Sequence, residues 1–386
     1  MKTPVIVDAC RTPIGRSHPE RGVFRDVRGD DLAALVIRAL VERTGVDPAA
    51  IEDVLVGCTQ QRDEQGFNVG RMASLLAGLP HEAAGAAINR LCGSSLQALA
   101  QASHAIIAGA EDVHVVAGVE HMQHLPMDAG ADTINPKLFH TTSKGAMMMG
   151  LTAEFLAQSQ GISREEQDLF ALGSHQKAAA ATAAGEFHGE IVPAWGRNEA
   201  GERTLIKSDQ CIRPDASIAA LAELSPAFMP QIGTVTAGNS SPLNDGAAAL
   251  LVMSNERAGE LKLSPLAKVC ATAVAGVDPA VMGTGPVPAV QKALKRAGMS
   301  LADIDLIELN EAFAAQALAC IQMLELDAER VNVHGGAIAL GHPLGASGAR
   351  IVTTLLHAMI ARNAAVGLAT MCVGMGQGVA VVIERV

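Results

Sequence analysis

The sequence predicts an α/β protein whose sheets are sandwiched between helices and which is built from two copies of one unit. Apolar helical patterns alternate with short strand patterns along most of the chain, as is typical of this class. The order of these patterns recurs once, at an offset of roughly 250 residues, which indicates an internal duplication. A chain of 386 residues is long enough for two such units, each with its own core.

The two copies show the same succession of elements. In each copy a helix pattern stops at a glycine, Gly45 or Gly298, and a strand pattern follows after a short loop. The first copy is expected to contain these segments in order: VIVDA (5–9), a helix over 31–44, IEDVLVG (51–57), AAGAAIN (83–89), a long apolar helix after Cys92, and a strand that ends near 120. The second is expected to contain a helix from 287, IDLIELN (304–310), a helix from about Ser347, and two strands within 366–384.

The repeat is interrupted between about Glu120 and Asn239. This stretch is rich in proline and contains an Ala-rich helix opened by a capping box, Ser163 and Glu166. We interpret it as a loop domain (120–239) inserted into the first half, and long insertions of this kind often shape ligand sites. The N-terminal half would then comprise residues 1–119 plus about 240–264, and the C-terminal half residues 265–386.

Composition excludes several classes of protein. The net charge is −11 and no run is rich in Lys or Arg, so nucleic-acid binding has little support. The seven cysteines are odd in number and form no C-x-x-C, which argues against a disulfide framework or a zinc site. His121 and His124 have helical spacing but lack a third ligand, so we expect no metal. The N-terminus has neither signal nor transit character, so we expect a cytoplasmic protein.

Cys92 is the first candidate for chemistry. It lies where a long apolar helix is expected to begin, and the helix dipole and free N–H groups there favour a thiolate. The alternative reading is a small buried core residue. His342 lies in GHPLGASGAR, at the position of the second copy that corresponds to the Cys92 loop. A histidine placed in a glycine-rich turn opposite a candidate nucleophile is a candidate base.

Two further segments add polar groups to the same region. Cys372 ends a buried strand before a run of alternating glycines, MCVGMGQG, whose N–H groups would suit an oxyanion hole. A thiol with a perturbed pKa at this place could carry protons. Asn310 ends the strand pattern IDLIELN and could hold a water that donates to a developing oxyanion.

Taken together, these motifs resemble the thiolase family. The resemblance extends over nearly the whole chain and is carried by these segments: VDACRTPIGR, NRLCGSSLQA, VTAGNSSPLNDGAAA, NEAFAAQ, GGAIALGHPLGASGAR and MCVGMGQG. It implies the thiolase fold, with duplicated βαβαβαββ halves in a five-layered α/β/α/β/α arrangement, an inserted loop domain and a homodimer.

The resemblance also implies the site. Cys92 would be the nucleophile, His342 its base, Cys372 a second acid/base and Asn310 the residue that holds the water. The N–H groups of Cys92 and Gly374 would form a second oxyanion hole. The reaction would be cleavage of a 3-ketoacyl-CoA by coenzyme A, with no metal or redox cofactor, since coenzyme A is a substrate.

The finer features favour the degradative branch of the family. Met148 stands where the biosynthetic acetoacetyl-CoA enzymes carry histidine, and a flexible apolar side chain suits a longer acyl chain, although core filling is an equal reading. Ser241 falls where the family contacts the pantetheine arm. Arg213 is a candidate for the nucleotide phosphates, although an ordinary surface arginine is the favoured interpretation. The resemblance implies a partner, an α-subunit with hydratase and dehydrogenase activities in an α2β2 complex. The alternatives are a biosynthetic thiolase, a ketoacyl synthase and a non-catalytic lipid-binding relative.

Overall fold

The computed structural model of the protein describes residues 2–127 and 134–386. Strands and helices alternate in the first half as the sequence predicts. The elements of this half are β1 (Pro4–Arg11), β2 (Gly15–Arg16), α1 (Gly29–Thr44), β3 (Asp53–Gly57), α2 (Val69–Leu76), β4 (Ala84–Ile88), α3 (Ser94–Ala108), β5 (Val113–His121), β8 (Asn244–Ser254) and α7 (Asn255–Glu260).

The second half repeats this succession. Its elements are β9 (Ala267–Gly276), α8 (Pro286–Ala297), β10 (Leu306–Leu309), α9 (Ala314–Leu324), α10 (Ala337–Leu340), α11 (Ser347–Ala361), β11 (Val366–Val373) and β12 (Gln377–Arg385). The predicted glycine stops are confirmed, because Gly45 and Gly298 both end their helices in the left-handed conformation, with φ of 65° and 68°. Val331 forms a parallel bridge to Ile307, which mirrors the pairing of β4 with β3.

The segment between β5 and β8 carries α4 (Met149–Ser159), α5 (Arg164–Ala184), the hairpin β6 (Ala194–Arg197) and β7 (Arg203–Ile206), and α6 (Ile218–Ala222). The predicted capping box opens α5, where Ser163 accepts from the N–H of Glu166 and the Glu166 side chain bonds back. Strand β8 pairs with β1 and β5, so residues 244–254 belong to the sheet of the first half. The exact boundaries of the three predicted parts stay predictions.

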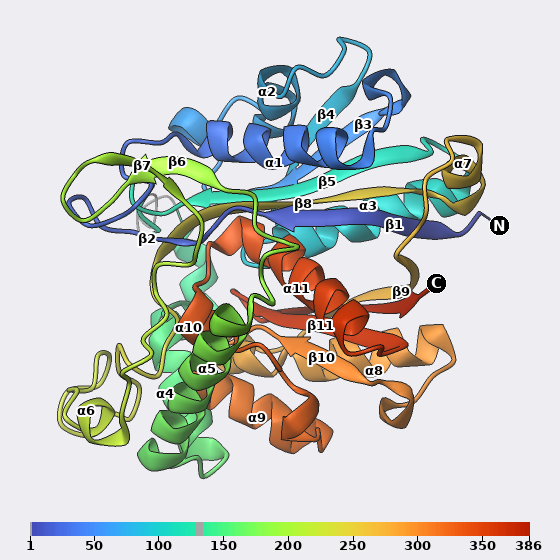
Figure 1. Cartoon of the computed structure of the whole chain (residues 1–386). Coiled ribbons are helices and arrows are strands. Elements are labelled where there is room, and N and C mark those ends of the chain that lie inside the picture. The colour runs from blue at the N-terminus through green and yellow to red at the C-terminus, as the bar shows by residue number, and fades with distance from the viewer. Residues whose placement is uncertain (1, 128–133) are drawn as a thin grey trace.

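The halves stack as five layers, which confirms the predicted thiolase architecture (Figure 1). Helices α1 and α2 cover the outer face of the first half's strands, and α8 and α9 cover that of the second half's. Helices α3 and α11 lie between the two sets of strands. One apolar cluster fills each outer boundary, and a single central cluster fills both boundaries of the middle layer, drawing on α3, α11 and strands of both halves.

Hydrogen bonds join the two sets of strands into one path of the order β10-β11-β12-β9-β1-β8-β5-β3-β4. The junction is short, since only Val5 and Ile6 of β1 pair with Lys268 and Ala267 of β9. Within each half the inner strands run parallel, as in β3 with β5 and β10 with β11, and their carboxyl ends therefore meet at one edge.

One stretch of the described chain is long and apolar enough to cross a membrane, Leu344–Ala361, and 83% of it is buried inside the protein. It contains α11, whose apolar surface packs against α3 and the strands on either side. The apolar character of α11 is thus explained by its central place in the core.

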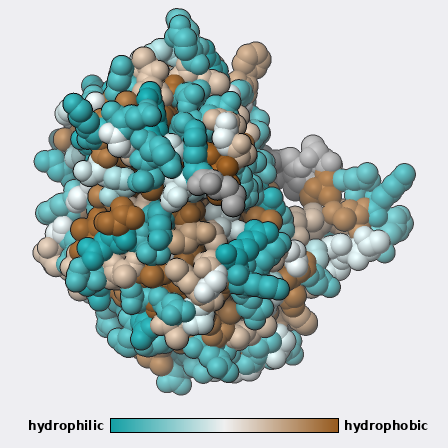
Figure 2. Space-filling model, turned by 90° about the vertical axis from the view of Figure 1, so that its right-hand side faces the viewer, coloured by the Kyte–Doolittle hydropathy of each residue, from teal (hydrophilic) through white to brown (hydrophobic). Residues whose placement is uncertain are grey.

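On the face shown in Figure 2, hydrophobic patches lie between larger hydrophilic areas.

Candidate active site

The N-termini of α3 and α11 meet in the middle layer, as the internal repeat predicted. The N–H of Ala349 in the first turn of α11 donates to Oγ of Ser95 in the first turn of α3, at 2.8 Å. Gly348 allows this approach, because a Cβ there would lie 2.3 Å from the backbone nitrogen of Leu96. The loop that carries Cys92 and the loop that carries His342 therefore lead into adjoining helix ends.

Cys92 lies in the turn before α3, following Leu91 in the left-handed conformation at φ 46°. Burial raises the pKa of its thiol to about 11, while the N–H groups of Gly374 and of Cys92 itself face the sulfur and oppose this rise. The sequence predicted a thiolate from the helix dipole, whereas the structure gives a protonated thiol. The effect of desolvation on the pKa is larger than that of the N–H groups. The resting thiol is neutral and has two N–H groups beside it.

Cys372 is the penultimate residue of β11 and is only 2% exposed. It packs with Met149, Met282 and Phe313 in a small apolar cluster. Burial raises the pKa of the Cys372 thiol, and the nearby thiols of Cys92 and Cys320 raise it further. The structure therefore places the second candidate thiol close to the first, inside an apolar wall.

His342 is 4% exposed and is held on three sides. Its backbone N–H donates to Oδ1 of Asn244 at 2.8 Å. In the ring, Nδ1 lies 2.6 Å from Oγ of Ser347 and Nε2 lies 3.4 Å from Nδ2 of Asn310. Burial lowers the pKa of His342 to about 3, and the charge of Arg350 contributes. The imidazole is neutral near pH 7 and can accept a proton.

Asn310 follows β10 and is fully buried. Its Nδ2 faces His342, and its Oδ1 has no hydrogen-bond partner among the described residues. A buried amide oxygen without a partner is costly, and a bound water would satisfy it. Such a water could donate its second hydrogen to an oxyanion beside His342.

Two buried carboxylates fix the loops around these groups. Glu120 accepts from Thr59, Gln60 and Gln65 and from the N–H of Gly345 in the His342 loop, at 2.6 to 3.1 Å. Glu311, next to Asn310, accepts from the side chains of Ser174 and Asn332 and from the N–H of Ile338. These contacts fix the loops through buried carboxylates of the protein itself, and such fixed positions favour oxyanion stabilisation.

Two of the residues predicted to contact the substrate, Ser241 and Met148, adjoin segments of the site. The N–H of Ser241 donates to the carbonyl of Ala312, so its loop runs beside the Asn310 turn. Met148 is 54% exposed at the N-cap of α4, whereas the next residue, Met149, packs beside Cys372. The exposed position of Met148 rules out the core-filling interpretation.

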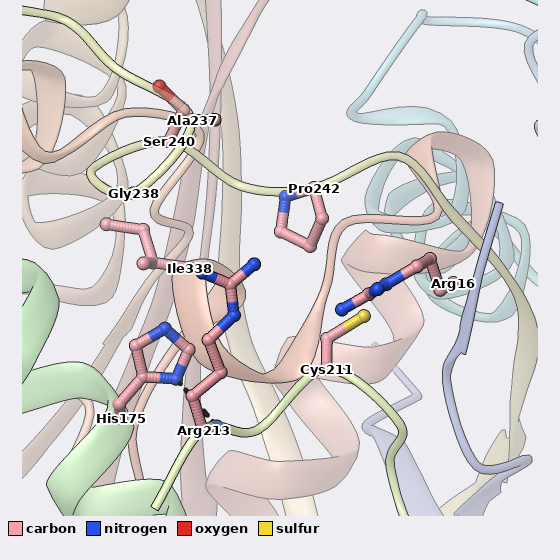
Figure 3. Close-up of a pocket in the computed structure, with 9 residues that line it drawn as sticks. All are labelled: Arg16, His175, Cys211, Arg213, Ala237, Gly238, Ser240, Pro242 and Ile338. Atoms are coloured by element: carbon pink, nitrogen blue, oxygen red, sulfur yellow. Dashed lines mark hydrogen bonds between the residues drawn. The ribbon is translucent and has the colours of Figure 1, made fainter. Parts of the chain in front are cut away.

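Arg213 is exposed and lines a pocket with Arg16, His175 and Cys211 (Figure 3). In this view the two guanidinium groups extend toward one another across the pocket. Within the described residues, neither forms an ion pair with a carboxylate. Burial and the charge of Arg213 lower the pKa of His175 to about 4, so the pocket carries two positive charges in a chain of net charge −11.

The His121–His124 pair does gain an acidic neighbour in the structure. Ligand atoms of Glu64, His121 and His124 lie within 4.8 Å of one another, and His124 Nδ1 is 3.0 Å from Glu64. All four ring nitrogens already have hydrogen-bond partners, among them the carbonyls of Phe24 and Arg25. These hydrogen bonds join three segments of the chain, around Phe24, Glu64 and His121.

Sequence reasoning missed the residues that support the catalytic groups. Asn244, Ser347 and Met149 contact His342 or Cys372, yet none was singled out. Ser347 alone had a local signal, because it lies five residues after His342 at the expected helix start. Asn244 comes from the distant strand β8, and only the fold brings it to His342.

The junction of the two duplicated α/β halves brings together a cysteine, a neutral histidine and a second cysteine. This arrangement defines an acyl-transferring enzyme with a cysteine nucleophile. The sequence matches the description "Thiolase, N-terminal domain" over residues 4–256 and "Thiolase, C-terminal domain" over residues 263–385. The chain belongs to the thiolase family.

Relatives with the name 3-ketoacyl-CoA thiolase match over the full length. The "3-ketoacyl-CoA thiolase" of Aliivibrio fischeri is 56% identical and that of a Marinomonas species is 54% identical, with 98–100% of each chain covered. Among solved structures, the acetyl-CoA acetyltransferase of Bacillus anthracis is 40% identical, with a TM-score of 0.92 over 100% of this chain and 99% of that one.

Proposed function

We propose that this protein is a 3-ketoacyl-CoA thiolase, an acetyl-CoA C-acyltransferase that cleaves 3-ketoacyl-CoA with coenzyme A in the last step of fatty-acid β-oxidation. The products are acetyl-CoA and an acyl-CoA shortened by two carbons. The observation that carries the proposal is the nearness of the Cys372 thiol and the Gly374 N–H to Cys92, with the neutral His342 in the loop that leads into the adjoining helix. The full-length relatives named 3-ketoacyl-CoA thiolase support it.

The first half-reaction forms a thioester on the enzyme. The sulfur of Cys92 attacks the 3-keto carbon while its proton passes to Nε2 of His342. Because both groups are neutral at rest, proton transfer accompanies the attack instead of preceding it. The oxyanion would be stabilised by the Nε2–H so formed and by a water held at Asn310.

Cleavage then separates the two-carbon unit. The bond between C2 and C3 breaks, C3 stays on Cys92 as a thioester, and the electron pair passes to C2 as the enolate of acetyl-CoA. The N–H groups of Cys92 and Gly374 would stabilise the enolate oxygen, and Cys372 would protonate C2. The raised pKa of the Cys372 thiol keeps it protonated until the enolate forms.

In the second half-reaction coenzyme A takes the acyl group. The Cys372 thiolate removes the proton of the incoming thiol, which attacks the thioester carbonyl, and Cys92 leaves with the proton held on His342. Both thiols then return to their neutral state. No step requires a metal or a redox cofactor, and coenzyme A enters only as a substrate.

Three residues are proposed to bind the substrate. Ser241 would contact the pantetheine arm, and Met148 the acyl chain at the mouth of the site. Arg213, with Arg16 across the pocket, would face the nucleotide phosphates, because neither forms an ion pair within the described residues.

We further propose a cytoplasmic homodimer that binds an α-subunit with enoyl-CoA hydratase and 3-hydroxyacyl-CoA dehydrogenase activities. Strand β4 supports the dimer, because it ends the sheet with one edge unpaired within the described chain. Phe67, two residues before α2, is 97% exposed, and Met72, Leu75 and Leu76 of α2 are also exposed. Sedimentation of the chain alone and with the α-subunit tests both contacts.

The activity is tested by coenzyme A-dependent cleavage of 3-ketoacyl-CoAs of increasing chain length, with and without the α-subunit. Rates that hold or rise with chain length support the proposal. Activity confined to acetoacetyl-CoA would overturn it in favour of the biosynthetic thiolase.

A further inference from the structure

We propose that Ser347 is a positioning residue that fixes the proton of the resting His342 on Nδ1, so that Nε2 presents the lone pair that accepts the Cys92 proton. The inference rests on the proposed function for its consequence in catalysis, but the position of the proton is a property of the protein alone. It is carried by the hydrogen bonds around one hydroxyl group.

The Ser347 hydroxyl has one hydrogen and two contacts. Its Oγ lies 3.0 Å from the carbonyl oxygen of Pro343, which can only accept, so the hydroxyl donates there. The Pro343 carbonyl also accepts from the N–H groups of Ala346 and Ser347. With its hydrogen directed at that carbonyl, the same Oγ, 2.6 Å from Nδ1 of His342, is left to accept from the ring. The proton of the neutral ring is thus on Nδ1.

The other side of the ring agrees with this assignment. Nε2 of His342 faces the amide nitrogen of Asn310 at 3.4 Å, and that nitrogen is a donor. A proton on Nε2 would place donor against donor. With the Asn310 amide in this orientation, the neighbours of the two ring nitrogens favour the same tautomer.

The environment explains why a hydroxyl performs this task. Ser347 is fully buried, and the charged group that acts most on His342 is the cation Arg350. A carboxylate on Nδ1 would favour the imidazolium at rest and remove the free lone pair. A neutral acceptor orients the ring and leaves it unprotonated, ready to take the thiol proton.

The same hydroxyl also makes the back-bond to a preceding carbonyl that serine often forms in helices, so a purely structural role must be distinguished. Thr353, six residues further along α11, provides the matched control. It is fully buried and its hydroxyl donates to the carbonyl of Ala349 at 2.8 Å, without contact to the site.

The experiment compares Ser347→Ala, Ser347→Cys and Ser347→Thr with Thr353→Val. The first readout is the ¹⁵N chemical shift of the His342 ring, and the second is the rate of Cys92 alkylation by iodoacetamide between pH 6 and 9. Neither needs thiolase activity, so a failure of the proposed function leaves this test intact. Turnover with a 3-ketoacyl-CoA is the third readout.

We expect Ser347→Ala and Ser347→Cys to show a mixture of tautomers, slower alkylation near pH 7, and kcat lower by about 10- to 100-fold with KM little changed. Ser347→Thr keeps the hydroxyl and should restore each value, and Thr353→Val should change none of them. A wild-type ring protonated on Nε2 would overturn the proposal, as would unchanged shifts and alkylation in a folded Ser347→Ala or Ser347→Cys variant.

Discussion

The Oγ of Ser95 on α3 accepts a hydrogen bond from the N–H of Ala349 on α11, at 2.8 Å. The first N–H groups of a helix have no partner within it, so the first half here caps the helix of the second. Cys92 lies three residues before Ser95, and His342 lies seven residues before Ala349. This contact therefore fixes the nucleophile loop and the base loop relative to each other.

Close backbone packing around that contact gives the first prediction. A Cβ on Gly57, at the end of β3, would lie 2.2 Å from the backbone nitrogen of Ser95. Gly57→Ala should lower the free energy of unfolding by ~1–3 kcal/mol and reduce turnover, because α3 must shift. Urea unfolding and a thiolysis assay measure both effects.

Gly173→Ala is the matched control for that change. Gly173 lies inside α5, and the position that a methyl group would take there has no other group within 4 Å. Alanine should therefore stabilise the helix by ~0.5–1 kcal/mol and leave turnover unchanged. Equal stability of the Gly57→Ala variant and the wild type would contradict the tight packing.

The nucleophile gives the second prediction. Cys92→Ala should abolish turnover and leave the unfolding midpoint nearly unchanged, because the change removes a single sulfur from a residue that is not fully buried as a whole. Cys270→Ala is the control, since Cys270 is also partly buried but contacts Glu384 on β12. Residual turnover by Cys92→Ala, measured against an enzyme-free blank, would rule out the assigned nucleophile.

The base gives the third prediction. The pKa of the Cys92 thiol is raised to about 11. Without His342, hydroxide from the solvent must remove its proton. His342→Ala should therefore slow alkylation of Cys92 near pH 7 by about 10²-fold or more, and the rate should then rise about tenfold per pH unit. Wild type should vary far less over pH 6 to 9. A rate unchanged by the substitution would show that His342 does not activate the thiol.

The buried imidazole also predicts how stability depends on pH. Folding lowers the pKa of His342 from 6.5 to about 3, so the unfolded chain binds more protons between these values. Stability should fall as the pH falls from 6.5 toward 3. By pH 4 this one group should account for ~3 kcal/mol, which His342→Asn would not lose.

The comparison for that prediction is the change within each protein, from pH 7 to pH 4, in the free energy of unfolding by urea. His175, whose pKa is about 4, titrates in both proteins and cancels. An identical loss in wild type and His342→Asn would mean that the histidine is not protected from protonation in the folded state.

Chain-length preference gives the fifth prediction. Met148 is exposed at the N-cap of α4, where an acyl chain entering the site would pass it. Met148→His should lower kcat/KM for long 3-ketoacyl-CoAs relative to acetoacetyl-CoA by about 10-fold, since a polar ring replaces apolar contact. Met323→His, also exposed but on α9, is the control. An unchanged preference would assign Met148 to surface packing.

Much of the fold could be predicted because its signals are local. The glycine that ends a helix, the capping box of α5 and the alternation of patterns depend on near neighbours, and the structure confirms them. The residues that support the catalytic groups could not be predicted, because Asn244 contacts His342 from 98 residues away in the sequence. Nothing in the sequence around either residue records that contact.

The state of Cys92 shows a second limit. The helix N-terminus was a valid reason to expect a lower pKa, and N–H groups do face the sulfur. Burial acts in the opposite direction and is larger, and its extent depends on how the strands and loops of both halves enclose the thiol. Sequence shows the dipole, whereas only the packed structure shows the desolvation.

The central claim is that the acyl group passes through a thioester on Cys92. It is tested most directly by mixing the protein with a long-chain 3-ketoacyl-CoA in the absence of free coenzyme A and analysing peptides by mass spectrometry. We predict that the Cys92 peptide gains the mass of the shortened acyl group, with stoichiometric release of acetyl-CoA. An acyl group found on Cys372 instead, or turnover without any acylated peptide, would contradict the account.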